Sequence, residues 1–296
     1  MDEKELAAQF ESLRPHLRSV AYRMLGSVSE ADDAVQEAWF RLHRADAAEV
    51  ENLKAWLTTV VARLSLDVLR ARQGRPDAPT GTRLPDPIVG TEDSPEADLV
   101  HLDSIGMALL VVLETLPAAE RLAFVLHDLF AVPFEDIAPI VQRTPTAARQ
   151  LASRARKRVQ DTAKPQDPDL SQQRAAVDAF LAASRNGDFD ALMAVLDPQV
   201  VLYSERPAQI GASIRQVTVR GAETVAKQSL FFSRQLGGER VVRVVRVNRG
   251  PGIVTYLGSE VYSVMAFTLT GGKIAEIHVL ADPARLKRLA LPQLRD

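Results

Sequence analysis

Apolar residues in the first 72 positions recur at steps of three and four, the spacing that places them on one face of an α-helix. The first such stripe runs from Leu6 to Met24 and ends at a Gly-Ser pair. Ser29, followed by acidic residues, predicts the N-cap of a second helix, whose apolar face continues to Leu42. A third stripe covers residues 52–72. The pattern predicts an all-helical domain over residues 1–72.

The helical pattern stops over residues 73–98, where prolines and glycines interrupt every repeat. Irregular chain of this length is unusual inside a compact domain, so it predicts a linker. Residues 83–89 within it keep apolar positions that a merely solvated tether does not need. Helical periodicity resumes over residues 99–163, with breaks near Pro117 and Pro133, and predicts a second helical domain.

The pattern changes after a second proline-containing tether at residues 164–169. Two helical stretches, 171–185 and 222–236, lie among runs of β-branched residues that alternate as strands do. The predicted strands cover residues 200–204, 240–248, 253–257, 261–270 and 273–280. The Gly271-Gly272 pair between the last two predicts a hairpin turn. Residues 170–296 are therefore expected to form an α+β domain with a curved, mostly antiparallel sheet.

Charge is distributed unevenly along the 296 residues, although the formal net charge is only −2. The small total excludes a chain that is basic throughout, and it leaves room for local basic surfaces. Residues 141–164 hold seven basic side chains and one acidic one, whereas residues 30–37 hold four acids and no base. A charge run is often only a solvated helix face, so its meaning depends on the elements that carry it.

Several classes of site are excluded by composition. The chain has no cysteine, which rules out disulfides, thiolate metal sites and a cysteine nucleophile and fits a reducing compartment. No run of about 18 apolar residues is present, and the charged N-terminus lacks the apolar core of a signal peptide. We therefore expect a cytoplasmic protein that has no contact with membranes and needs neither a metal nor a cofactor.

The basic run coincides with a helix-turn-helix pattern. A short helix is predicted over residues 134–141, and Thr144 with Pro145 forms a good N-cap and first position for the next helix. Outward residues early in the second helix suit base contacts, and the basic residues after them suit phosphate contacts. The predicted base contacts are Thr146, Arg149, Gln150 and Ser153, and the predicted phosphate contacts are Arg154, Arg156, Lys157 and Arg158.

Two blocks of sequence resemble a known family. Residues 32–42 (DDAVQEAWFRL) and 52–70 (NLKAWLTTVVARLSLDVLR) resemble region 2 of extracytoplasmic-function sigma factors of RNA polymerase. Leu116-Pro117, residues 134–141 and residues 153–158 resemble region 4, with no room for region 3 between the blocks. The resemblance implies an all-α pair of sigma regions, 1–72 and 99–163, followed by an NTF2-like or SnoaL-like α+β cone over residues 170–296.

The linker carries the mark of a subgroup. Residues 84–89 (LPDPIV) resemble the WLPEPLV motif of sigma-J-type factors that have a SnoaL-like C-terminal extension, with Arg83 in place of the tryptophan. That resemblance implies regulation through the linker and intramolecular control by the C-terminal domain. The linker residues expected to matter are Leu84, Pro85, Pro87 and Val89. The subgroup often has a glycine-rich stretch after the first strand of this domain, where this chain has residues 204–209.

The resemblance also implies the partners, which are core RNA polymerase, through its β′ clamp helices and β flap, and promoter DNA. The residues expected to bind polymerase are Asp32, Asp33, Gln36, Glu37 and Arg41. The residues expected to contact the −10 element are Asn52, Lys54, Arg63 and Arg70. Trp56 lies four positions before Val60, a spacing that favours core packing over stacking on a base.

The C-terminal domain leaves alternatives open. Tyr203, Glu276 and His278 could line a pocket, because Glu276 and His278 are two apart on a strand and share a face. One alternative is an NTF2-like enzyme fused to a DNA-binding segment, in which these residues act as acid and base. Another is a ligand-sensing DNA-binding regulator that works without polymerase. The expected function is nevertheless that of a non-enzymatic sigma factor, which directs promoter-specific initiation.

Overall fold

The computed structural model describes residues 3–45, 51–73, 83–90, 106–162, 167, 169–207, 214–236, 240–289 and 291. The chain divides into two compact units, residues 1–78 with 112–162 and residues 79–111 with 163–296. Residues 83–90 and 106–111 therefore pack with the C-terminal unit. The predicted linker positions 74–82 and 91–98 and most of the predicted tether at 164–169 lie outside the described residues.

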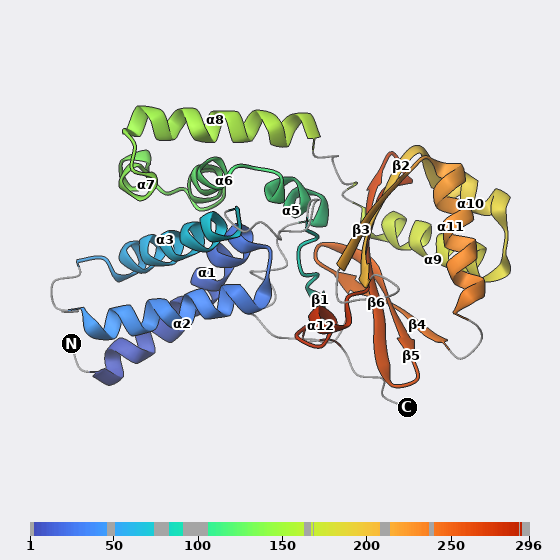
Figure 1. The fold of residues 1–296 in the computed structure, drawn as a ribbon, viewed down its shortest axis with the longest axis horizontal. Coiled ribbons are helices and arrows are strands. Elements are labelled where there is room, and N and C mark those ends of the chain that lie inside the picture. The colour runs from blue at the N-terminus through green and yellow to red at the C-terminus, as the bar shows by residue number, and fades with distance from the viewer. Residues whose placement is uncertain are drawn as a thin grey trace. The chain divides into compact units, whose positions relative to one another are not determined.

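The first unit is helical, and its order follows the predicted pattern closely (Figure 1). The N-terminal helices are α1 (Glu3–Leu25), α2 (Val28–Arg44) and α3 (Leu53–Gln73). The later elements are the end of α5 (Met107–Glu114), α6 (Ala118–Phe124), a π-helical turn η2 (Val125–Leu129), α7 (Phe134–Val141) and α8 (Pro145–Thr162). The prolines at the predicted breaks, Pro117 and Pro133, stand at the N-caps of α6 and α7.

The second helix begins two residues earlier than predicted. Ser27, not Ser29, is the N-cap of α2, because its backbone is extended and its carbonyl accepts the first helical hydrogen bond from Ala31 at 3.0 Å. The Ser27 side chain makes no capping hydrogen bond. The sequence pointed to Ser29 because acidic residues follow it.

Buried charged groups join the early and late helices of this unit. Arg121 of α6 is fully buried. It donates one hydrogen bond from Nη2 to Glu114 at 2.7 Å and another from Nε to the Arg23 carbonyl at 3.1 Å. Phe130 lies edge-on to the His16 ring, and the Arg23 guanidinium lies 5.0 Å from the Phe130 ring centroid. Helix α3 also contacts α6 and α7, so the N-terminal and later helices form one packed body.

The second unit is built on a seven-stranded sheet in the order β1-β4-β5-β6-β7-β2-β3 (Figure 1). Only the β2–β7 pair is parallel among the described strands, which fits the predicted mostly antiparallel sheet. The strands are β1 (Val89–Gly90), β2 (Leu196–Pro207), β3 (Ile214–Arg220), β4 (Arg240–Val247), β5 (Gly250–Leu257), β6 (Glu260–Thr270) and β7 (Lys273–Leu280). Of these, β1 and β3 were not predicted.

Each face of the sheet has its own apolar core. Helices α9 (Leu170–Asn186), α10 (Phe189–Val195) and α11 (Ala222–Gln235) cover one face, with Phe180, Leu202 and Ile253 in the core between them. The other face buries Leu84 and Val89 of the linker, the first turns of α5, and the short helix α12 (Pro283–Leu286). Helices α10 and α12 were not predicted from the sequence.

The predicted hairpin between β6 and β7 is present. Gly271 and Gly272 both have positive φ, 61° and 74°, as a tight turn between twisted strands requires. Their amide groups donate to the Asp167 carboxylate at 3.0 and 2.7 Å. Asp167, from the predicted second tether, thus holds this turn.

Candidate promoter-binding surfaces and linker site

The helix-turn-helix of the first unit forms as its sequence predicts. Gln142 ends α7 in the left-handed conformation, with φ of 55°. The Thr144 hydroxyl accepts a hydrogen bond from the Ala147 amide at 3.2 Å, and Pro145 takes the first position of α8. Ala148, Ala152 and Ala155 are fully buried along the inner face of α8. Small inward residues let α8 pack closely while its other face stays in solvent.

The outward face of α8 presents the predicted base-contacting residues. The exposed members of this face are Thr146, Arg149, Gln150 and Ser153. The Arg149 guanidinium lies 5.3 Å from the Phe134 ring centroid, so a cation–π contact orients it at the start of α8. The four side chains lie within two turns of one helix, a spacing that fits the edges of successive bases in a major groove.

The basic residues farther along α8 are more constrained than predicted. Arg154 and Arg158 both pair with the buried carboxylate of Glu120, at 2.9 and 3.1 Å. Arg156 pairs with Asp128 at 2.6 Å. Three of the four residues predicted to contact phosphates therefore hold α8 to α6 and η2 through ion pairs. The run of basic residues in the sequence did not reveal this structural role. Lys157 is exposed on the same helix.

The acidic face of α2 is partly paired. Asp32 accepts two hydrogen bonds from Arg18 of α1, the shorter at 2.6 Å, and Glu37 pairs with Arg41 at 3.2 Å. Asp33 and Gln36 are exposed. All five predicted polymerase contacts lie on the solvent side of α2. The opposite side is the buried apolar stripe that includes Ala31, Val35 and Leu42.

The predicted −10 residues are spread along α3, with Asn52 and Lys54 at its start, Arg63 at its middle and Arg70 near its end. Asn52 is the N-terminal cap of this helix, where its Oδ1 accepts from the Ala55 amide at 3.0 Å. Lys54 and Arg63 are exposed, and Arg70 lies 3.9 Å from Asp67. Trp56 is half-buried, so its exposure lies between that expected for core packing and that expected for stacking on a base. Asn52 therefore has a structural task as the cap of α3.

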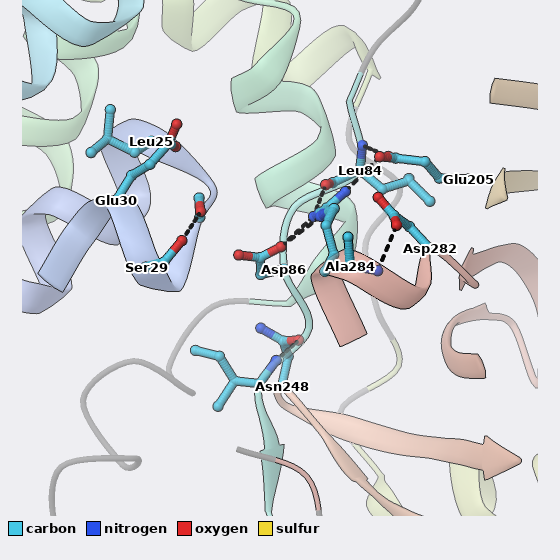
Figure 2. A network of polar contacts seen from close by, with 12 residues as sticks. Leu25, Ser29, Glu30, Leu84, Asp86, Glu205, Asn248, Asp282 and Ala284 are labelled. Carbon is cyan, nitrogen blue, oxygen red and sulfur yellow. Dashed lines mark hydrogen bonds and ion pairs between the residues drawn. The ribbon is translucent and has the colours of Figure 1, made fainter. Parts of the chain in front are cut away.

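The linker motif lies in a site made by β2, β4 and α12 (Figure 2). The Leu84 amide donates to Glu205 Oε2 at 2.9 Å, and its carbonyl accepts from Arg285 at 2.6 Å. Asn248 exchanges two hydrogen bonds with Ile88, at 3.3 Å from the Ile88 amide and 2.8 Å to its carbonyl. Val89 and Gly90 then add the short strand β1 to the edge of β4.

The sequence of the motif explains why it fits a buried site. Pro85 and Pro87 have no amide hydrogen, so two fewer donors need partners when the segment is buried. Proline also restricts the residue before it to an extended backbone, which keeps Leu84 and Asp86 in one conformation. Every residue from 84 to 90 is buried. The predicted linker residues Leu84, Pro85, Pro87 and Val89 are thus all buried, and Leu84 and Val89 belong to an apolar core of the C-terminal unit.

Three buried charged side chains hold the motif in place. Arg285 donates to Asp86 Oδ1 from Nε at 2.9 Å and to Glu205 Oε1 from Nη1 at 2.7 Å. Burial lowers the pKa of Arg285, but the charges of Asp86 and Glu205 outweigh that effect and raise it. One guanidinium is thus the shared cationic partner of two buried carboxylates. Sequence reasoning missed Arg285 and Asn248, since neither belongs to a local motif.

Comparison with known proteins identifies the two helical regions. Residues 9–75 match the family described as Sigma-70 region 2, and residues 106–159 match Sigma-70, region 4. The chain is 38% identical to the ECF RNA polymerase sigma factor SigJ of Mycobacterium tuberculosis, over 97% of this chain and 95% of that protein. The chain belongs to the extracytoplasmic function (ECF) sigma factors.

Further similarities extend to the whole chain of this ECF sigma factor. A probable ECF sigma factor SigI of M. tuberculosis is 35% identical over 96% of each chain. The crystal structure of M. tuberculosis SigJ superposes with a TM-score of 0.77, covering 97% of this chain and 100% of that one. The predicted fold class is confirmed as helical sigma regions 2 and 4 followed by an α+β domain of helices and a mixed sheet.

As a sigma factor, the protein is a transcription initiation factor and not an enzyme, and its family binds core RNA polymerase and promoter DNA. In the described part of the chain, no helix is long and apolar enough to cross a membrane. The same residues contain no cluster of three or more His, Asp and Glu side chains suited to a metal ion.

The predicted pocket residues of this sigma factor do not line its cavity. Tyr203, Glu276 and His278 lie on the sheet face toward Leu84 and Val89, whereas the cavity in the described domain opens on the opposite face, beside Leu202 and Ser204. The Tyr203 and His278 rings stack at 5.2 Å, and His278 Nε2 lies 3.3 Å from Glu276 without hydrogen-bond alignment. Burial, with the Glu276 charge, raises the pKa of Tyr203. Strand alternation correctly predicted that Glu276 and His278 share one face of the sheet, but the cavity lies on the opposite face.

Proposed function

We propose that the C-terminal domain of this ECF sigma factor controls initiation by holding the linker between sigma regions 2 and 4. The observation that carries the proposal is that residues 84–90 are all buried, with hydrogen bonds to β2 and α12 and strand pairing with β4. A segment that serves only as a tether needs no buried residues, whereas this one has seven. The segment lies between region 2 and region 4 in the chain, so its capture restrains the connection between them.

Promoter geometry supports a change in this connection during initiation. The −10 and −35 elements are separated by about 25 base pairs, or roughly 85 Å of duplex at about 3.4 Å per pair. The helical unit that contains both regions is compact, and a unit of its length is roughly 40 Å across. Regions 2 and 4 therefore have to separate before each reaches its own promoter element. The linker is the covalent connection that limits or permits that separation.

Three interaction surfaces bind polymerase and the two promoter elements. Asp33 and Gln36, exposed on α2, offer an acidic and polar face to the β′ clamp helices of polymerase, with Asp32, Glu37 and Arg41 beside them. Residues of region 4 contact the β flap and read the −35 element with Thr146, Arg149, Gln150 and Ser153. The exposed side chains of Lys54 and Arg63 on α3 contact the −10 region.

Run-off transcription with core RNA polymerase tests the proposal. Arg285→Ala and Asp86→Asn release the linker, whereas Arg288→Ala removes an exposed cation close to the same helix and serves as the matched control. We expect both release variants to change transcript yield at least about threefold, with core binding close to that of the unchanged protein. Such a change corresponds to about 0.65 kcal/mol, well within what loss of a buried ion pair can shift.

Binding to core polymerase, measured by size-exclusion co-elution, separates the two parts of the proposal. Yields for Arg285→Ala and Asp86→Asn that equal the Arg288→Ala yield would reject control through the linker. Asp33→Arg is expected to abolish co-elution, and a variant that still co-elutes at the original affinity would reject the α2 surface.

A further inference from the structure

The C-terminal domain contains a cavity that neither the promoter surfaces nor the linker site uses. It lies between the sheet and helices α9 and α11 and has a volume of about 990 Å³. Phe180, Leu202, Phe232, Ile253 and Met265 supply much of its apolar wall. This size and this lining are those of a site for a small organic molecule.

A cluster of arginines adjoins the cavity where α9 and α11 end. Arg185, Arg234 and Arg240 surround a hollow of about 530 Å³, which shares Ser184, Ser233 and Arg240 with the cavity. No acidic side chain is among the described residues that line this hollow. Cations near a helix C-terminus can simply stabilise its last carbonyls. Arg240 does so in part, because it donates to the Ser233 carbonyl and hydroxyl, each at 2.7 Å.

The helix ends do not compensate this positive charge fully. Burial lowers the pKa of Arg240, and the charge of the neighbouring Arg185 lowers it further. The two guanidinium groups therefore repel each other next to an apolar cavity. A bound carboxylate, phosphate or sulfonate would remove this repulsion and accept charge-assisted hydrogen bonds from the arginines.

We propose that this cavity binds an organic anion with an apolar body, its acidic group at Arg240 and Arg185 and its body against Phe180, Leu202 and Phe232. Arg206 adds a second cation to the wall, with its guanidinium 5.0 Å from the Phe232 ring centroid. Glu260 is the carboxylate among the described lining residues, and it is exposed at the turn between β5 and β6. The lining thus favours an acid over an amine of the same shape.

Two fluorescent probes of matched shape test this proposal on the full chain. The first, 8-anilinonaphthalene-1-sulfonate, carries the acidic group, and the second, N-phenyl-1-naphthylamine, has the same ring system without it. We expect saturable binding of the sulfonate at one site per chain and its displacement by decanoate. Arg240→Gln is expected to weaken the sulfonate about tenfold, the effect of one lost charge-assisted hydrogen bond, and to leave the neutral probe within twofold.

Matched variants locate the effect. Arg243→Gln removes the same charge from the same strand on the opposite sheet face, so it is expected to leave sulfonate binding unchanged. Glu260→Gln removes the carboxylate found among the described lining residues and is expected to tighten sulfonate binding. Arg185→Gln replaces Arg240→Gln if circular dichroism shows that the latter unfolds. Absence of saturable sulfonate binding, or equal weakening by Arg240→Gln and Arg243→Gln, would overturn the proposal, as would equal loss of both probes in a folded Arg240→Gln protein.

Discussion

Arg285 and Asp86 stand 199 positions apart in the chain, yet the Arg285 Nε donates to Asp86 Oδ1 at 2.9 Å in a fully buried site. The same guanidinium reaches Glu205 at 2.7 Å and the Leu84 carbonyl at 2.6 Å. A helix of four residues at the end of the C-terminal domain therefore decides where the linker between the sigma regions lies. Single substitutions at Arg285 and Asp86 therefore test whether the position of the linker controls initiation.

Arg285→Ala is expected to lower the free energy of unfolding of the C-terminal domain by about 3–5 kcal/mol. The loss is large because Asp86 and Glu205 then stay buried without a cation. Urea unfolding followed by circular dichroism measures it, and Arg288→Ala, at an exposed position, is expected to change the value by less than about 0.5 kcal/mol. Faster hydrogen exchange at the Leu84 and Ile88 amides would accompany the release. A loss below about 1 kcal/mol would show that this ion-pair network contributes little.

Arg149→Ala and Lys157→Ala are expected to affect promoter binding in different ways. Arg149 lies on the outward face of α8 near its start, so its loss relaxes selectivity at one or two −35 positions by about 1–3 kcal/mol. Lys157 suits a phosphate contact, so its loss weakens all sequences alike and reduces the salt slope by about 1. Binding to a panel of −35 variants at several salt concentrations separates these outcomes. Unchanged selectivity in Arg149→Ala would reject its role in reading bases.

Glu120→Gln is expected to strengthen non-specific DNA binding. The Glu120 carboxylate holds Arg154 and Arg158, and both arginines become available to phosphates once that charge is removed. Each additional phosphate contact steepens the dependence of log affinity on log salt by about 0.9, so a change of about 1–2 is expected. Salt titration of a fluorescent duplex measures the slope. Asp128→Asn, which releases Arg156 alone, is the smaller control, and an unchanged slope in both variants would contradict the idea.

Gly26→Ala is expected to destabilise the helical unit more than Gly258→Ala destabilises the C-terminal unit. Both glycines have positive φ, 63° and 58°, so each substitution carries a similar backbone cost of about 1 kcal/mol. A Cβ at Gly26 would also overlap Glu114 Oε1, the partner of the buried Arg121, whereas a Cβ at Gly258 meets open space. Thermal unfolding of the two variants gives the comparison. Equal losses would mean that the Glu114–Arg121 pair adjusts at no cost.

Local signals explain which elements were predicted. The helices of regions 2 and 4 were found because an apolar stripe, a cap and a proline act within a few residues of one another, as at Thr144 and Pro145. The same rules chose Ser29 over Ser27 because acidic residues follow Ser29, whereas the extended backbone of the N-cap lies at Ser27. The strand β3 and helix α10 carry weaker local patterns and were missed. Arg154 and Arg158 were assigned to DNA because their partner Glu120 is 34 and 38 positions away.

The sequence by itself determined the family, the helical sigma regions, the helix-turn-helix and the strands that follow, because those depend on short-range periodicity and motif spacing. Tertiary structure alone decided which face of each strand meets the cavity and which meets the linker. Strand alternation groups Tyr203 with Glu205 and Glu276 with His278, but only the pairing of β2 with β7 brings Tyr203 beside His278. The packing of α9 and α11 on the other face then turns these residues away from the cavity. Likewise, nothing near Arg285 in the chain predicts a partner in the linker, since the buried pairing of one guanidinium with two distant carboxylates arises from the folded sheet.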